Sequence, residues 1–349
     1  MSGKAGPSDG APLDGDLAAH GNAFAEGAGT AISWLTVVPM RGAKVFDRIT
    51  GRRAMAAAPI AGFVPGLAAV LVSVIVSGGA WLFARVGGIG AGAAWFGGLS
   101  DSGVSQSPSA GGMAADPMSG VGLAGDPGVA AVAAATSPLL AALMGVLIVC
   151  VAELVTRAMH IDGLADVADA LGSYRDPEGA REILRSPDTG PMGAGAVALT
   201  LVAQAAAMAV LAHGFAVAVF PAPWILDAEF DVVRVVASAL MLALPFVIGR
   251  AAATTACHRS LPPMAPTGFG ALVGATQSTW TLVAWWVPLT AAGAIVAGVA
   301  GVLACLAVMV FAVVFGRLAV RRLGGVNGDV LGAIIQMATL IAAIFFALG

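Results

Sequence analysis

Long apolar stretches alternate along the chain with short polar connections. A helix needs about 20 mainly apolar residues to cross a bilayer, and each stretch has about this length. The 280–320 run is twice as long as one crossing requires and has Gly298 and Gly301 near its middle, so it is divided in two. The pattern therefore predicts about seven transmembrane helices, over residues 55–84, 130–157, 192–220, 235–256, 280–299, 301–320 and 329–348.

The chain outside these spans contains three less regular segments. Residues 1–25 are rich in Gly, Ala, Asp and Pro and are expected to form a disordered tail, whereas 26–349 are expected to form one transmembrane catalytic domain. Residues 31–40 are apolar but too short to span, which predicts an interfacial or re-entrant helix. Residues 100–128 lack periodicity and are predicted to be a flexible loop insertion.

The composition supports the same class of protein. With 58% hydrophobic residues, 11% charged residues and a mean hydropathy of +0.91, the chain is predicted to be an all-α polytopic integral membrane protein surrounded by membrane lipid. A net charge of -3 gives no sign of a nucleic acid partner. Three cysteines in apolar runs predict neither a disulfide framework nor a zinc site. Small residues at helical spacing occur throughout and do not distinguish a monomer from an oligomer.

The basic residues predict the orientation of these spans. With seven crossings, all but two of the 17 Lys and Arg residues fall on one side of the membrane, and the exceptions are Arg85 and Arg234. Basic loops stay in the cytoplasm, so this side is predicted to be the cytoplasmic face of a bacterial inner membrane. The loop 157–191, which contains most of the acidic residues of interest, lies on that face.

Three carboxylates are crowded into this loop. Asp162, Asp166 and Asp169 are spaced i, i+4 and i+7, so they fall within roughly 60° of arc on one face of a helix. Like charges at this spacing destabilise a helix. A hard divalent cation would bridge them, which predicts a Mg²⁺ site formed by these aspartates, with His160 close by.

Other polar residues of the same face suit a phosphorylated substrate. Arg175, Arg181 and Arg185 are candidates for phosphate contacts, although the positive-inside rule explains them equally well. Gly190 and Gly193, directly before a span, would let backbone N–H groups approach a phosphate.

Two further spans contain polar residues at their cytoplasmic ends. Asp329 begins the last span and would either complete a metal shell or stabilise the N-terminus of that helix. Arg250 lies inside the fourth span and needs an anionic partner. Glu153 and Arg157 are spaced i, i+4 and are expected to pair with each other.

The blocks just described resemble a known family. His160 to Asp169 looks like the His-x-Asp-Gly-Leu-Ala-Asp-x-x-Asp signature of the cobalamin synthases, also called adenosylcobinamide-GDP ribazoletransferases. Residues 324–333 resemble their Gly-Gly-Val-Thr-Gly-Asp block, with Asn327 in place of threonine, and 33–39 resemble their N-terminal Phe-Leu-Thr-x-x-Pro. The chain departs from the family at 186–189, where a Lys-Asp-Ser-Arg run is usual, and at Ala265, where an arginine is expected.

The resemblance implies the last assembly step of the cobalamin nucleotide loop. The ribose 3′-hydroxyl of α-ribazole, or of its 5′-phosphate, would attack adenosylcobinamide-GDP at the phosphorus linked to cobinamide, and GMP would leave. The catalytic residues implied are His160, as the candidate base, and the three aspartates that hold Mg²⁺. The substrate-binding residues implied are Arg175, Arg181, Arg185, Gly190, Gly193, Arg250, Asn327 and Asp329, of which Asp329 is also a candidate metal ligand.

Two other functions are weighed against this one. Membrane phosphotransferases that join CDP-activated lipids to alcohols also have an Asp-Gly-x-x-Ala start, but an arginine and distant aspartates follow it, whereas Asp166 follows here at once. A cation transporter would have carboxylates near the bilayer midplane. The predicted spans carry their carboxylates at the ends, so transport ranks third.

Overall fold

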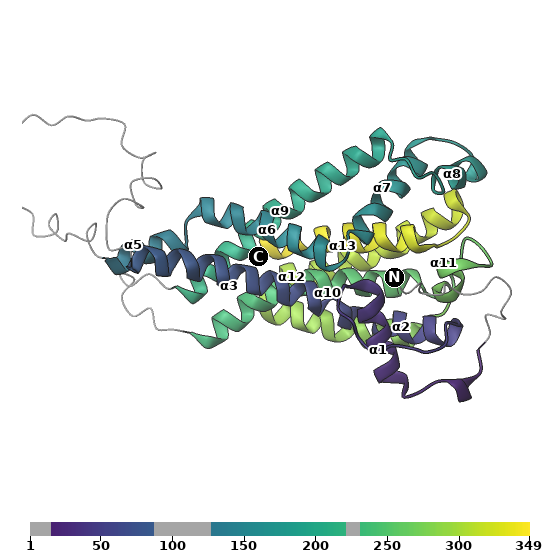
Figure 1. Cartoon of the computed structure of the whole chain (residues 1–349), viewed down its shortest axis with the longest axis horizontal. Coiled ribbons are helices and arrows are strands. Elements are labelled where there is room, and N and C mark those ends of the chain that lie inside the picture. The colour runs from purple at the N-terminus through teal and green to yellow at the C-terminus, as the bar shows by residue number, and fades with distance from the viewer. Residues whose placement is uncertain (1–14, 87–126, 221–230) are drawn as a thin grey trace, which may run out of the picture.

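Helices form almost all of the regular structure in the computed structural model, which describes residues 15–86, 127–220 and 231–349 (Figure 1). No strand forms within these three ranges, which confirms the all-α prediction. The helices are η1 (Leu17–Ala19), α1 (Ala23–Leu35), α2 (Arg48–Ala61), α3 (Phe63–Val86), α5 (Pro127–Ala135), α6 (Pro138–Val155), α7 (Met159–Gly172), α8 (Pro177–Ile183), α9 (Pro191–Val219), α10 (Val232–Ala256), α11 (Gly268–Val273), α12 (Thr279–Leu323) and α13 (Gly328–Ala347).

Six apolar helical segments in the described ranges are long enough to cross a membrane, which confirms a multi-pass protein. They are 48–86, 130–155, 191–219, 232–256, 279–323 and 328–347. The first joins α2 to α3 through Gly62, and the second contains the end of α5 and all of α6.

The 45-residue helix α12 contains a reversal of the chain at Gly298, where φ is 56° and ψ is -132°. This region of conformational space is accessible to glycine and strained for other residues. The backbones of Gly293 and Gly301 touch, so a β-carbon on either would overlap the other. The two arms of α12 therefore run side by side, and the described residues provide seven membrane-length arms, with the division at the predicted place.

The N-terminal helix differs from the expected one. The helix predicted over 31–40 is wrong in its bounds, since α1 covers Ala23–Leu35 and is followed by Thr36, whose backbone is extended, and by an irregular segment. Asn22 begins the helix earlier, because its Oδ1 accepts hydrogen bonds from the backbone N–H groups of Phe24 and Ala25. Beyond its end, the Val37 N–H donates to the carbonyl oxygen of Val155 at 2.7 Å, which draws the segment towards α6.

Two predicted segments are described only in part. Residues 15–25 belong to the expected tail, yet they contain η1 and the start of α1, and His20 hydrogen-bonds both Glu26 and Asp47. Of the expected 100–128 loop, residues 100–126 lie outside the described residues, and 127–128 begin α5.

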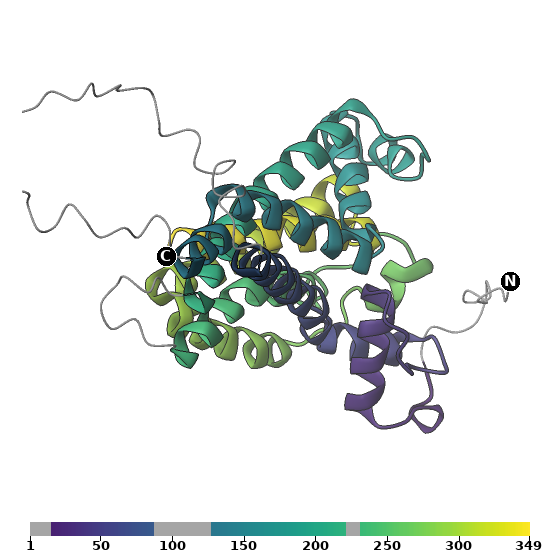
Figure 2. The same ribbon diagram turned by 60° about the vertical axis from the view of Figure 1, so that its left-hand side comes forward.

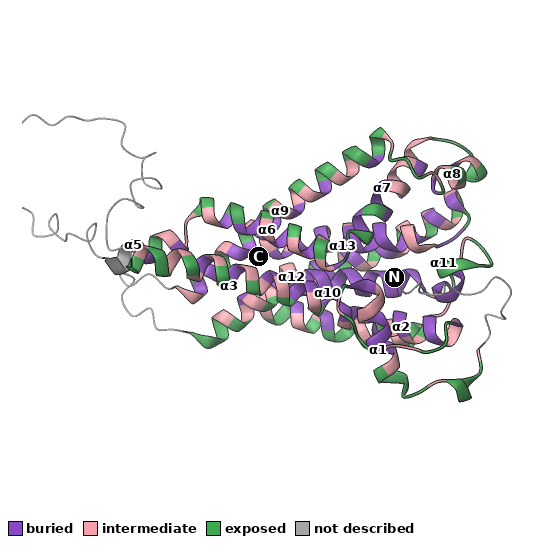
Figure 3. Ribbon diagram, in the orientation of Figure 1, coloured by how far each residue is buried: buried purple, intermediate pink, exposed green. Residues whose placement is uncertain are grey.

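The helices form an elongated bundle with a polar end. The short helices α1, α2, α7, α8 and α11 gather at one end, on the right of Figure 1, and α5 lies at the other (Figures 1 and 2). Helices α10 and α13 run through the middle and are largely buried, whereas α9 exposes much of one face (Figure 3). The two buried helices α10 and α13 thus form the centre of the bundle to which the polar end is attached.

Candidate active site

The position of α7 depends on the turn that precedes it and on two glycines. Arg157 and Ala158 both adopt left-handed backbone conformations, with φ of 59° and 53°, so α7 is separate from α6. A β-carbon on Gly163 would lie 2.7 Å from the carbonyl oxygen of Asp329, and one on Gly332 would lie 3.1 Å from that of Met159. Glycine at both places lets α7 approach the start of α13 closely.

This approach brings the carboxylates of two helices together. Asp162 is exposed, while Asp166 and Asp329 are half-buried. Burial, and then the charges of Asp162, Asp329 and Asp169, raise the pKa of Asp166 to about 6. Such mutual repulsion fits oxygen ligands that face a hard cation such as Mg²⁺. Among the described residues, no group of three His, Cys, Asp or Glu side chains is itself arranged to hold a metal ion.

Asp169 holds the start of α9. Its two carboxylate oxygens accept hydrogen bonds from the backbone N–H groups of Gly190, at 2.7 Å, and Gly193, at 2.8 Å. A β-carbon at either glycine would overlap the carboxylate, which explains the Gly-x-x-Gly pair without a phosphate. Substrate binding by this pair, and metal binding by Asp169, stay predictions.

His160 is in α7, two residues before Asp162. The side chain is buried, and its Nε2 has no hydrogen-bond partner among the described residues. Burial, and then the charges of Arg250 and Arg157, lower the pKa of His160 well below its ordinary value, so the neutral form of the ring is favoured near pH 7. It lines both the large cavity described below and a small polar pocket inside the bundle.

The small pocket is lined by polar side chains from five helices, α6, α7, α9, α10 and α13. Gln336 of α13 donates from Nε2 to Glu153 Oε1 of α6, at 2.8 Å, and to Gln204 Oε1 of α9, at 2.9 Å. Arg250 of α10 is only 2% exposed and donates to the carbonyl oxygen of Phe246. The predicted Arg250 thus lines the same small pocket as His160 and Glu153, and it does not line the large cavity.

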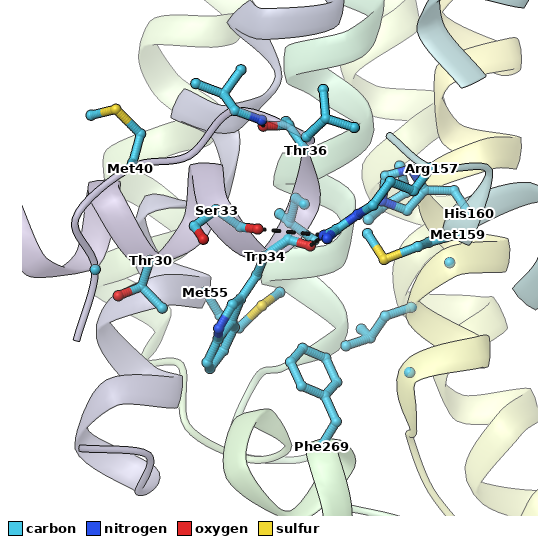
Figure 4. A pocket seen from close by; sticks show the side chains of 18 of the residues that line it. Thr30, Ser33, Trp34, Thr36, Met40, Met55, Arg157, Met159, His160 and Phe269 are labelled. Atoms are coloured by element: carbon cyan, nitrogen blue, oxygen red, sulfur yellow. Dashed lines mark hydrogen bonds between the residues drawn. The ribbon is translucent and has the colours of Figure 1, made fainter. Parts of the chain in front are cut away.

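The expected pairing of Glu153 with Arg157 is wrong. No ion pair joins these two described residues, and Arg157 reaches away from the bundle instead. Its Nη2 donates to the carbonyl oxygens of Trp34, at 2.7 Å, and Ser33, at 3.4 Å (Figure 4). The left-handed backbone at Arg157 directs the side chain towards the end of α1 rather than along α6.

A cavity of about 1020 Å³ opens beside α7 and α13 (Figure 4). His160, Asp162 and Asp329 lie on one wall. The other wall is formed by the end of α1, the segment after it, α2 and α11. The resemblance of 33–39 to a family block pointed to part of this wall, but no sequence signal identified Phe46, Met55 or Thr30.

The remaining predicted residues do not line the cavity. Arg175 and Arg185 are exposed, and Arg181 donates to the carbonyl oxygen of Pro177 beside the turn at Gly324. Asn327 caps α13 by accepting from the Val330 N–H, and its Nδ2 donates to Asp329 Oδ2 at 2.7 Å. The structure therefore gives Asn327 a role in orienting Asp329.

Comparisons with known proteins point to one family. A family model described as cobalamin-5-phosphate synthase matches residues 103–347. An adenosylcobinamide-GDP ribazoletransferase of Corynebacterium efficiens is 37% identical, over 99% of this chain and 97% of that protein. Proteins of the same name from Corynebacterium diphtheriae and Frankia casuarinae are 34% and 29% identical, over 95% and 91% of this chain and 94% and 93% of theirs. No solved structure matches.

Proposed function

The chain belongs to the cobalamin-5-phosphate synthase family, and from this membership we propose that it catalyses the last assembly step of cobalamin synthesis. In this proposal the protein joins adenosylcobinamide-GDP to α-ribazole or to its 5′-phosphate. GMP is the second product.

The reaction exchanges one phosphorus–oxygen bond for another. The ribose 3′-hydroxyl oxygen forms a bond to the phosphorus that carries cobinamide. The bond from this phosphorus to the oxygen that bridges the two phosphates breaks, and that oxygen leaves with GMP. The hydroxyl proton passes to a base, so atoms and charge are conserved.

The observation that carries the proposal is the meeting of carboxylates from α7 and α13 beside the cavity. We assign Asp162, Asp166 and Asp329 to the metal, with Asn327 holding Asp329 in place. Mg²⁺ is commonly bound by one or two carboxylates together with substrate phosphates, so the protein need not supply a complete ligand set. When bound, Mg²⁺ would neutralise charge on the diphosphate.

His160 is the candidate base. A neutral imidazole accepts a proton from a hydroxyl, and burial beside two arginines favours the neutral form of this ring. The ring also lines the cavity that contains Asp162 and Asp329. Asp169 keeps α9 against α7, and Arg181 lies beside the turn at Gly324 that precedes α13.

The distribution of Lys and Arg residues supports an assignment of the site to one side of the membrane. Arg85 ends α3 and Arg234 begins α10, whereas the short helices of the site lie at the opposite end of the bundle (Figure 1). By the positive-inside rule, the carboxylates face the cytoplasm of a bacterial cell.

The test is GMP release by the purified protein in detergent, supplied with adenosylcobinamide-GDP and α-ribazole 5′-phosphate. We expect release only with Mg²⁺, and a loss of about 100-fold or more in Asp162→Ala and Asp166→Ala, because a metal contributes several kcal/mol. Glu178→Ala, an exposed carboxylate of α8, is the matched control. Release without metal, or full activity in both aspartate variants, would contradict the proposal.

A further inference from the structure

The two walls of the large cavity differ in chemistry. One wall carries His160, Asp162 and Asp329, whose carboxylates suit a metal that would in turn bind phosphates. The facing wall carries Trp34, Phe46 and Phe269, together with aliphatic and methionine side chains and the hydroxyl side chains of Thr30, Ser33 and Thr36. A single ligand that spans this cavity would therefore have one charged part and one flat, apolar part.

The aromatic wall is built from three segments far apart in the sequence. Trp34 and Phe46 stack with ring centroids 6.2 Å apart and planes 16° apart, while Phe269 meets Trp34 edge-on at 5.3 Å. Phe46 remains 46% exposed and Phe269 37% exposed. All three lie outside the helices long enough to cross a membrane. Exposed aromatic faces that line a cavity mark a binding surface.

The aromatic wall is also held at a fixed place relative to the carboxylates. Arg157, three residues before His160, donates to the carbonyl oxygens of Ser33 and Trp34 (Figure 4). A second link runs from the Val37 N–H to the Val155 carbonyl oxygen. The left-handed backbone at Arg157 costs conformational free energy, and strained residues of this kind are typically found at functional sites.

We propose that Trp34, Phe46 and Phe269 bind the benzimidazole base of the ribazole acceptor, so that its ribose lies towards His160 and Asp162. This assignment rests on the proposed function. A benzimidazole is flat and apolar, and it presents a single ring nitrogen to hydrogen-bond donors. Guanine would bring several donors and acceptors against a mainly apolar wall whose Thr30 and Thr36 hydroxyls already hydrogen-bond the backbone, so most of its polar groups would be left unpaired at a cost. A corrin carries polar amide side chains around its rim and fits this wall equally poorly.

The test measures the KM of each substrate separately, because only the KM of the acceptor should depend on the aromatic wall. Phe269→Leu removes an aromatic face on which the base would stack, so it should raise KM for α-ribazole 5′-phosphate about 10-fold, which corresponds to about 1.4 kcal/mol. The KM for adenosylcobinamide-GDP should stay unchanged, and Phe269→Tyr should restore the acceptor KM. Phe24→Leu is the matched control, because Phe24 is an exposed aromatic of α1, the helix that carries Trp34, and does not line the cavity.

Binding of α-ribazole measured by calorimetry gives a readout that needs no turnover. We expect Phe269→Leu to weaken it by the same factor. If both KM values and the calorimetric affinity stay unchanged, or if only the KM for adenosylcobinamide-GDP rises, the wall binds something other than the base and the inference fails. If the wild-type protein releases no GMP at all, it is the proposed function that fails.

Discussion

Replacement of Asp169 by asparagine separates a structural role from metal binding. The carboxylate accepts two backbone N–H hydrogen bonds, from Gly190 and Gly193, at the start of α9. An asparagine has one carbonyl oxygen and an NH₂ group, so one bond is lost and a donor is turned towards a donor. A hydrogen bond to a charged group contributes about 1.5–3 kcal/mol, and a negative charge at a helix N-terminus adds about 0.3–1 kcal/mol. Asp169→Asn should therefore lower the free energy of unfolding by about 2–4 kcal/mol.

The assay is unfolding by titration with sodium dodecyl sulfate in mixed detergent micelles. Asp176→Asn is the matched control, because Asp176 is an exposed N-cap that accepts from the Gly179 N–H. Asparagine caps a helix as well as aspartate, so this control should change stability by less than about 0.5 kcal/mol. The Mg²⁺ concentration that half-activates GMP release should stay unchanged in folded Asp169→Asn. Unchanged stability together with a raised Mg²⁺ requirement would refute this reasoning and make Asp169 a metal ligand.

Two further predictions concern packing and pH. Gly332→Ala should lower the free energy of unfolding by about 1–3 kcal/mol and reduce activity, because its β-carbon would lie 3.1 Å from the backbone of α7. Gly195→Ala is the control and should not lower it, because a β-carbon there has nothing within 4 Å. Burial opposes the charged form of His20, but hydrogen bonds to Asp47 and Glu26 outweigh it and raise the pKa of His20. Its contribution is full below the ordinary value of 6.5 and is lost as pH rises through the raised pKa. The wild-type protein should therefore unfold at a lower temperature at pH 8.5 than at pH 6, by a difference that His20→Gln reduces; an equal difference in that variant would show that His20 is not the group responsible.

Much of the fold was predictable because each membrane span is visible in the sequence as one continuous apolar run. The length of each apolar run is fixed by the thickness of the bilayer, and Gly298 marks the reversal inside the longest run. The N-terminal helix was misplaced because the apolar run 31–40 outweighed the weaker signal of a cap at Asn22. The path of the chain after Thr36 includes a hydrogen bond from the Val37 N–H to the Val155 carbonyl oxygen, a tertiary contact that a local sequence pattern does not predict.

The sequence predicted only those parts of the candidate site that lie within one helix. The i, i+4, i+7 spacing placed the aspartates of α7 on one face, but it did not show that Asp169 turns to α9. A Gly-x-x-Gly pair suits a phosphate or a carboxylate equally well, and the choice depends on which group the fold brings there. The aromatic wall gave even less signal, because Trp34, Phe46 and Phe269 come from three separate segments.

The most direct test of the central claim is metal binding by the carboxylates of α7 and α13. Mn²⁺ can be titrated into the purified protein in the presence of adenosylcobinamide-GDP, and the free ion can be measured by electron paramagnetic resonance. We expect saturable binding that is displaced by Mg²⁺ and is weakened about 10-fold or more in Asp166→Asn and in Asp329→Asn, since each removes one anionic ligand. Unchanged affinity in both variants would contradict a shared metal site between the two helices.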